Sequence, residues 1–517
     1  MPRRFALLAL LAFPAVGSPA DPLHVRLDAV IDRAAKTNGV PLSDPADDAE
    51  FLRRAWLDFA GRIPTATEAR AFLDDTSADK RARLVDGLLK KPGYAAHLAH
   101  RFHLMLMERL GDHPEWTKYL EASFAANVPW DRMARDMLKA EAGHGATFFL
   151  AKRLEHYGEQ PVEYAALTRD VGRLFLGKNL QCAECHDHLT VAEYKQAHFQ
   201  GLHAFFKNTS LLDLKALKVG EKPTTAKTPF ASVFDMRPMA TGPALPGGGM
   251  IDVPPVEKGK EFSTPPDPKT NTPGVLKFST LAAVAEKLPT AENRDFARNM
   301  ANRLWFLLLG RGLVHPLDLH HAGNPPSHPE ALDLLAGELV RAKFDMKLLL
   351  REIALTRAYG RSGRLPKGVE KPADPKHFAT ALEKRLSGET LCAITGLATG
   401  TTPPEGLRAK FVKAYAAPPR EPEEEVRPSL RAALFLRNDE AFLALLNPAP
   451  GTLVDRLAEL PREKVAEELY LSVLTRRPTA DETAAVGKVL EKQDDKTAAV
   501  GKLVWALLAS AEFGVNH

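Results

Sequence analysis

Two cysteines and four histidines lie close together in one stretch of the chain, LGKNLQCAECHDHLTVAEYKQAHFQGLHAFF. Its CAECH segment places Cys182 and Cys185 about one helical turn apart, and His186 follows directly. This is the spacing of a covalent haem attachment site, in which two thiols bond to the haem and the histidine binds the iron. The motif therefore predicts haem c held by Cys182, Cys185 and His186, with His186 as the metal ligand.

Three other uses of these residues remain open. A zinc ion could be bound by Cys182, Cys185 and two of the nearby histidines, since thiolate and imidazole are the usual zinc ligands. The two cysteines could form a structural disulfide. They could also form a redox dithiol, although such a motif normally follows a strand in a βαβ unit, and the flanking sequence lacks that pattern.

The remaining histidines and the third cysteine are weaker candidates. His188 lies too close to His186 to reach the opposite face of a haem, so we expect it to form local hydrogen bonds. Cys392 is expected to be a buried apolar residue. The other histidines considered are His198 and His203 on an expected helix, the surface or interface histidines His97, His100 and His103, and the loop pair His320 and His321.

The second axial position of a haem iron is expected to hold a histidine or to stay open. Small cytochromes c commonly use a methionine there, but no methionine lies between Met137 and Met236. Met236 itself falls in a loop-like region together with Met239 and Met250. A methionine ligand would raise the potential of the iron, so the choice of ligand affects function.

The N-terminus MPRRFALLALLAFPAVGSPADP has the pattern of a secretory signal peptide. Arg3 and Arg4 precede a short apolar segment, and small residues follow it, which predicts cleavage after Ala20. The protein is therefore expected to be exported, either to the periplasm or to the extracellular space. No later segment is apolar enough to predict a membrane span in the mature chain.

Composition narrows the functional classes further. Three cysteines in 517 residues cannot form a disulfide scaffold, and a net charge of +4 does not indicate nucleic-acid binding. Most of the chain shows apolar residues at three- and four-residue spacing, which predicts helices. Residues 208–278 are instead rich in Pro, Gly, Lys and Thr, with a possible short strand at FASVFDM.

These patterns predict a mainly α protein with two helical domains joined by a long Pro/Gly-rich connector, with a few short strands. The predicted segments are a signal peptide at 1–20, a first helical domain at 21–207, the connector at 208–278 and a second helical domain at 279–517. Helix starts are indicated by three Ser/Thr-x-x-Glu capping boxes, each after a proline. These boxes are Thr65 to Glu68, Ser327 to Glu330 and Thr479 to Glu482.

Several stretches together resemble a family of exported planctomycete proteins. LGKNLQCAECHDH, GLHAFF and FLRRAWLDFAGRIPTATEARAFL resemble its N-terminal cytochrome-c-like domain of unknown function. NMANRLWFLLLGRGLVHPLDLHHAGNPPSHPEALDLLAGEL, FDMKLLLREIALTRAY and the chain's ending resemble the planctomycete-specific C-terminal domain of unknown function that usually follows. Cys182, Cys185 and His186 match the family's haem-like motif. Leu189 and His198 depart from its usual residues, proline and an acidic residue.

The resemblance implies an exported, c-type-cytochrome-like protein that carries one covalent haem for electron transfer or for redox support of an exported protein partner. One alternative is a structural or interaction protein with a zinc or disulfide clip at the motif. Another is a haem- or metal-dependent extracellular oxidoreductase. The sequence names no substrate, so catalytic residues are not assigned.

Overall fold

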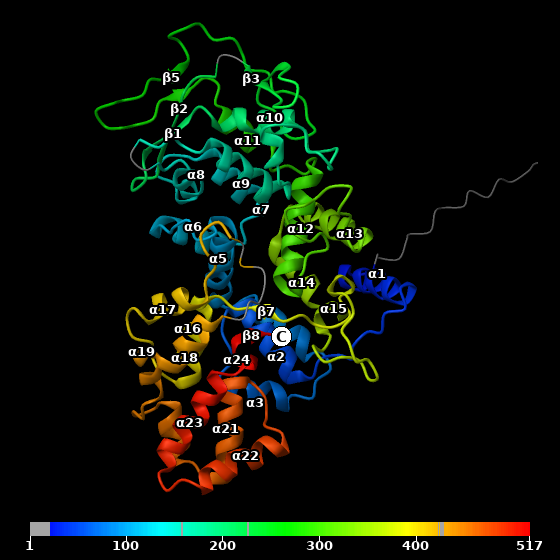
Figure 1. Ribbon diagram of the computed structural model, residues 1–517, viewed down its shortest axis with the longest axis vertical. Helices are drawn as coiled ribbons and strands as arrows, with labels where there is room; N and C mark the ends of the chain where they lie inside the picture. The colour runs from blue at the N-terminus through cyan, green and yellow to red at the C-terminus, as the bar shows by residue number, and fades with distance from the viewer. Residues whose placement is uncertain (1–20, 157–158, 225–226, 422, 424–428) are drawn as a thin grey trace, which may run out of the picture.

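The computed structural model describes residues 21–517, apart from 157–158, 225–226, 422 and 424–428. The predicted signal peptide, residues 1–20, lies outside these ranges. The described chain is mainly α, which confirms the predicted fold class (Figure 1). Among the described residues, no helix combines the length and the apolar character that a bilayer span requires.

The first part of the chain is a series of short helices. Amphipathic spacing explains them: α7 (Trp130–Lys139) buries Trp130, Met133, Met137 and Leu138 on one side. The others are α1 (Leu23–Thr37), α2 (Asp48–Ala60), α3 (Ala66–Asp74), α4 (Lys80–Leu88), α5 (Pro92–Met107), α6 (Pro114–Ala125), η1 (Gly145–Thr147), α8 (Phe148–Arg153), α9 (Tyr164–Leu176), η2 (Cys182–Glu184) and α10 (Gln196–Phe206).

The predicted connector contains three two-stranded antiparallel hairpins, which lie at one end of the molecule in Figure 1. The possible strand at FASVFDM is only partly present, because its strand ends at Ala231 and Val233–Met236 form the hairpin tip. The strands are β1 (Thr209–Asp213), β2 (Lys218–Glu221), β3 (Thr228–Ala231), β4 (Pro238–Thr241), β5 (Phe262–Thr264) and β6 (Val275–Leu276).

The remainder of the chain returns to helices. The last long helices reach the opposite end of the molecule, and the chain then ends nearer its middle (Figure 1). Its first elements are α11 (Thr280–Lys287), α12 (Arg294–Leu309), α13 (Pro329–Arg341), α14 (Met346–Ala354), α15 (Arg357–Gly360), η3 (Pro375–His377) and β7 (Lys384–Arg385). Its last are α16 (Gly388–Thr399), α17 (Leu407–Tyr415), α18 (Leu430–Asn438), α19 (Glu440–Leu443), η4 (Ala444–Leu446), α20 (Leu453–Glu459), α21 (Arg462–Leu474), α22 (Ala480–Glu491), α23 (Lys496–Leu508), α24 (Ala511–Gly514) and β8 (Val515–Asn516).

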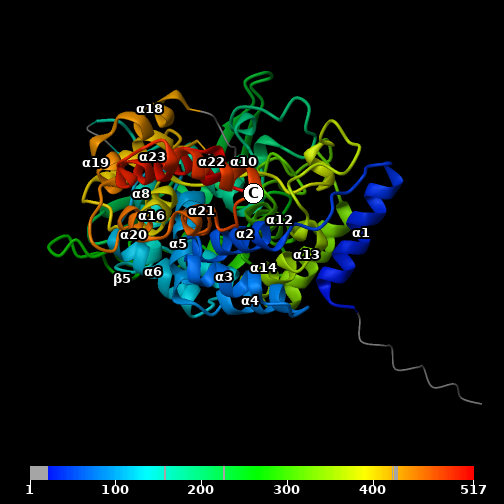
Figure 2. The same ribbon diagram turned by 90° about the horizontal axis from the view of Figure 1, so that it is seen from below.

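The buried apolar residues form two cores that do not divide at the connector. The first core joins helices α1–α10 to α11–α15, so helices on both sides of the connector pack together. Figure 2 shows one such contact, with α1 beside α13 at the edge of the molecule. The second core contains helices α16–α24 together with Leu57 and Ile63 from the α2 region. The predicted domain limits at 208 and 278 stay a prediction. Along the chain, the change from the first core to the second falls near residue 380.

Helix α2 contacts both cores and carries polar side chains into the interior. Arg53 and Arg54 are buried although they are charged. Arg53 donates to the carbonyl oxygen of Phe513 at 3.0 Å, and Arg54 donates to that of His517 at 3.1 Å. These bonds attach the end of the chain to a helix near its beginning, because buried guanidinium groups require acceptors.

Two of the three predicted capping boxes are confirmed. Thr65 with Glu68 and Thr479 with Glu482 close both reciprocal hydrogen bonds at the starts of α3 and α22. The box predicted at Ser327 is wrong. Helix α13 begins at Pro329, which is favoured at the first helical position, so His328 takes the cap position and no side chain caps the helix.

Gly177 ends α9 with a left-handed backbone, φ +67°, beneath the ring of His320. A Cβ atom there would lie 2.6 Å from His320 Cδ2. We expect Gly177→Ala to lower the free energy of unfolding by more than the roughly 1–2 kcal/mol typical of a left-handed alanine, because the His320 loop must also move. Gly39→Ala is the matched control, since Gly39 has φ +64° and open space. Equal losses in urea unfolding would contradict the steric contribution.

Candidate functional site

The CxxCH motif forms a tight turn after α9. Lys178 pairs with Leu319 in an isolated β-bridge, and Asn179 N–H donates to Asp318 O at 2.8 Å. The chain then enters the short helix η2, in which Cys185 N–H donates to Cys182 O at 3.4 Å. Both cysteines are exposed free thiols. The turn therefore presents two thiols to solvent from a segment that is held at its base.

His186 is oriented by a hydrogen bond to the backbone. Its Nδ1 lies 2.7 Å from the carbonyl oxygen of Asp187. A carbonyl can only accept, so Nδ1 carries the proton and Nε2 keeps its lone pair in the neutral ring. Metal-binding histidines usually donate their second nitrogen to a carbonyl or carboxylate in this way. The His186 ring is therefore in the tautomer that a metal ligand through Nε2 requires.

The tip of the β3–β4 hairpin lies against the motif. Val233 N–H donates to Cys185 O at 3.1 Å, and the rings of His186 and Phe234 are 4.7 Å apart. Gln196 fixes the hairpin from α10 by donating to Ala231 O at 3.0 Å. The hairpin of the connector is thus part of the site.

The hairpin tip exposes unusually large apolar side chains. Val233 is 57% exposed, Phe234 68% and Met236 69%. We call these three residues the apolar rim. Leu189, three residues after His186 in the sequence, is 75% exposed. Exposed apolar groups gathered at one place commonly mark a binding surface. Sequence reasoning missed this feature, although the run Val233-Phe234 stands out in a connector rich in Pro, Gly and Lys.

The other histidines of the stretch are held in local contacts. His188 Nδ1 accepts from Thr190 N–H at 3.2 Å and from Val191 N–H at 3.1 Å, which confirms its predicted local role. His198 and His203 lie on α10, as predicted. Their Nδ1 atoms lie 2.9 Å from Glu193 O and 3.2 Å from Thr168 Oγ1, respectively.

The α5 histidines lie in another part of the molecule, because α5 is near its middle and α10 is near one end (Figure 1). His100 Nε2 lies 2.9 Å from Ser387 Oγ, and Trp116 Nε1 donates to His103 Nδ1 at 3.1 Å. His97 is buried. His100 thus contacts the segment that begins α16, and the structure brings none of the three histidines to the CxxCH motif.

Cys392 and the pair His320 and His321 lie in the surroundings that the sequence predicts. Cys392 is buried, as predicted. His320 and His321 lie in a loop, and Tyr194 donates its hydroxyl hydrogen to His320 O at 3.0 Å. Within the described ranges, no group of three or more His, Cys, Asp or Glu side chains is arranged to hold a metal ion.

Comparison with known families places two matches on the chain. Residues 26–211, which include the CxxCH motif, match the family described as PSCyt2, protein of unknown function (DUF1549). Residues 282–430 match the family described as PSD1, protein of unknown function (DUF1553). The chain carries two domains of unknown function. No curated protein and no solved structure matches it. The β3–β4 hairpin lies between the two matched segments.

His320, which lies in the segment similar to PSD1 and packs on Gly177, makes the stability of the fold sensitive to acid. Burial, together with the nearby charges of Arg303 and Arg298, lowers the pKa of its imidazole to about 3. Between pH 6.5 and about 3 the unfolded chain binds a proton that the folded chain does not, so stability falls as pH falls. This histidine should remove about 1 kcal/mol of unfolding free energy between pH 6 and pH 5.

The variant His320→Gln should reduce this pH dependence in chemical denaturation. His156→Gln, at an exposed position, is the control and should keep the wild-type slope. An unchanged slope in His320→Gln would assign the acid sensitivity to other groups.

Proposed function

We propose that Cys182, Cys185 and His186 attach one covalent haem c, and that the exported protein serves electron transfer or the redox chemistry of a protein partner. The observation that carries this proposal is the His186 hydrogen bond to Asp187 O, which leaves Nε2 free beside two exposed thiols. A bound haem would supply one-electron redox chemistry. The chain's own residues supply the attachment, the ligand and the apolar surroundings.

The side chains of the apolar rim are better suited to cover a haem than to remain exposed to water. Val233, Phe234 and Met236 project from a hairpin that is bonded to Cys185 O. A porphyrin is flat and apolar over most of its surface, so these side chains would lose water contact when they cover it. A small zinc clip at the same thiols would leave the rim exposed. This difference favours haem over zinc.

A single haem in a chain of 517 residues favours a role with a partner over a role as a small diffusing carrier. The thiol-bearing turn lies at the surface, where a second protein can approach within electron-transfer range. Most of the remaining helices are then available for binding. The partner is expected to be another exported protein, because attachment and redox exchange take place in the same compartment.

The attachment is tested by producing the full chain in a periplasm with cytochrome c maturation proteins. A denaturing gel should show haem staining at the position of the exported protein. Cys182→Ser and Cys185→Ser should each weaken the covalent attachment, and the double variant should abolish it. Cys392→Ser is the control and should stain like the wild type. A colourless, correctly exported protein would contradict haem, and one zinc ion per chain in that protein would establish the alternative.

The second axial position is expected to be open or to hold a histidine. The test is the near-infrared charge-transfer band of the oxidised protein, read together with its electron paramagnetic resonance spectrum. A methionine–iron band would contradict the expectation. Met236→Leu, Met239→Leu and Met250→Leu would then identify the ligand, because these are the three methionines of the predicted connector.

A further inference from the structure

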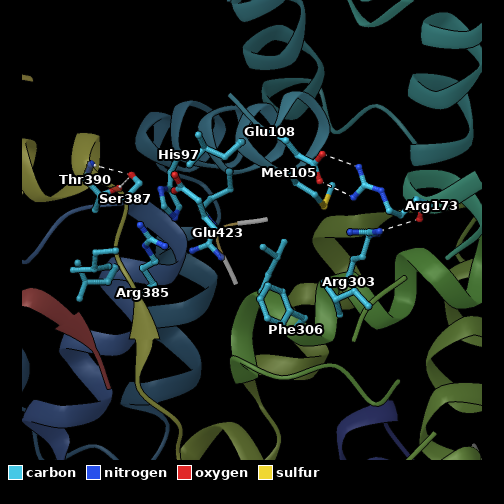
Figure 3. A pocket seen from close by; sticks show the side chains of 16 residues that line it. His97, Met105, Glu108, Arg173, Arg303, Phe306, Arg385, Ser387, Thr390 and Glu423 are labelled. Atoms are coloured by element: carbon cyan, nitrogen blue, oxygen red, sulfur yellow. Dashed lines mark hydrogen bonds and ion pairs between the residues drawn. The ribbon is translucent and has the colours of Figure 1, made fainter. Parts of the chain in front are cut away.

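A second candidate site is a partly open cavity between the two cores, shown in Figure 3. It has a volume of about 80 Å³ and is lined by parts of α2, α5, α12 and the β7–α16 segment. None of the described residues from 177 to 206 lines it, so it is separate from the CxxCH motif. Ligand sites commonly lie at such junctions. Its apolar walls include Leu57, Leu104, Phe306, Leu307, Leu317 and Leu386.

Most charged groups around the cavity are already paired. Glu108 accepts two hydrogen bonds from Arg173, at 2.6 and 2.7 Å, on one side of the cavity (Figure 3). Glu423 accepts from Arg109 Nε at 3.0 Å. Neither carboxylate is therefore available as the sole counter-ion of another cation.

Two more cavity arginines also donate within the protein. Arg303 donates to Asp318, and Arg385 donates to the carbonyl oxygen of Tyr415. In Figure 3, Arg303 lies on the same side as Arg173, and Arg385 lies on the opposite side. These guanidinium groups have structural partners.

Arg101 differs from the other cavity arginines. Its side chain is partly buried and lines the cavity, yet it makes no hydrogen bond or ion pair with any residue that the structure describes. Burial lowers the pKa of its guanidinium, which shows that the charged form has lost solvation. A guanidinium group remains charged at ordinary pH. Asp58 and Glu423 attract this charge, but neither forms a hydrogen bond or close ion pair with it among the described residues. A desolvated guanidinium group without hydrogen-bond acceptors is costly, so an anion that accepts from it in the cavity would stabilise the protein.

The surroundings define the chemistry of that counter-ion. A guanidinium group matches the two oxygens of a carboxylate, and the leucine-rich walls match a hydrocarbon tail. Arg101 offers one positive charge, while Glu108 and Glu423 would repel a second negative charge on the ligand. A single water needs roughly 10–15 Å³ of such volume, so a cavity of about 80 Å³ has room for several waters or for one small organic molecule. These features favour a monoanion over sulfate or phosphate.

We propose that this cavity binds a short-chain monocarboxylate, with Arg101 as its counter-ion and the apolar walls around its tail. The ligand would fill the junction at which Leu57 and Leu386 of the second core face Leu307 of the first. A ligand that binds only the folded chain stabilises it by mass action. The proposal concerns Arg101 and the cavity alone and does not require haem.

The test uses the full exported chain and butyrate, which has six non-hydrogen atoms. Butyrate should bind with one-to-one stoichiometry in calorimetry and raise the unfolding temperature as its concentration rises. Butyramide and sulfate should do neither, because the first lacks the charge and the second lacks the tail. Arg101→Met should weaken butyrate binding at least about tenfold, the loss expected for one charge-assisted hydrogen-bonding group.

Two further variants make the result decisive. Arg437→Met replaces an exposed arginine on α18 and should bind butyrate like the wild type. Leu104→Trp keeps Arg101 but fills the cavity, and should abolish binding. Equal butyrate affinity in Arg101→Met, equal affinity for butyramide, or the absence of saturable butyrate binding by the folded wild type would each overturn the proposal, the last meaning that the cavity holds only water.

Discussion

The buried carboxylate of Asp58 on α2 holds the two cores of the protein together. It accepts hydrogen bonds from the hydroxyl of Tyr359 at 2.8 Å and from the amide of Asn516 at 2.7 Å, and it forms an ion pair with Lys384. These partners are 301, 458 and 326 residues away in sequence. A buried ion pair adds little net stability, but removing one member leaves an uncompensated charge, so the network fixes its members in place.

The cavity depends on the same network. Lys384 is the first residue of β7. The next three residues, Arg385 to Ser387, line the cavity, and Ser387 caps the start of α16. Burial lowers the pKa of Lys384 to about 8, although Asp58 favours its charged form. The neighbouring residue of Asp58, Leu57, forms part of the facing wall. The pair of Asp58 and Lys384 therefore ties together two segments that line the cavity.

Local patterns could be predicted from the sequence, and contacts between distant residues could not. Helix spacing, the Thr65 capping box and the CxxCH turn depend on neighbours within one or two helical turns. The place of the hairpin tip could not be predicted, because it depends on the hydrogen bond from Val233 N–H to Cys185 O. The cavity could not be predicted either, because Arg101 differs from other arginines only in the residues that surround it. Even a local pattern failed at Ser327, where Pro329 moved the helix start by one residue.

Asp318 lies between the two proposed sites and connects them through the end of α9. Its backbone oxygen accepts from Asn179 N–H at the base of the CxxCH turn, and its carboxylate pairs with Arg173 and Arg303 beside the cavity. Coupling between sites requires an element with two arrangements that each ligand biases differently. No second arrangement of Asp318 is seen, so its bonds argue for a structural support that holds the base of the thiol-bearing turn and the cavity arginines together.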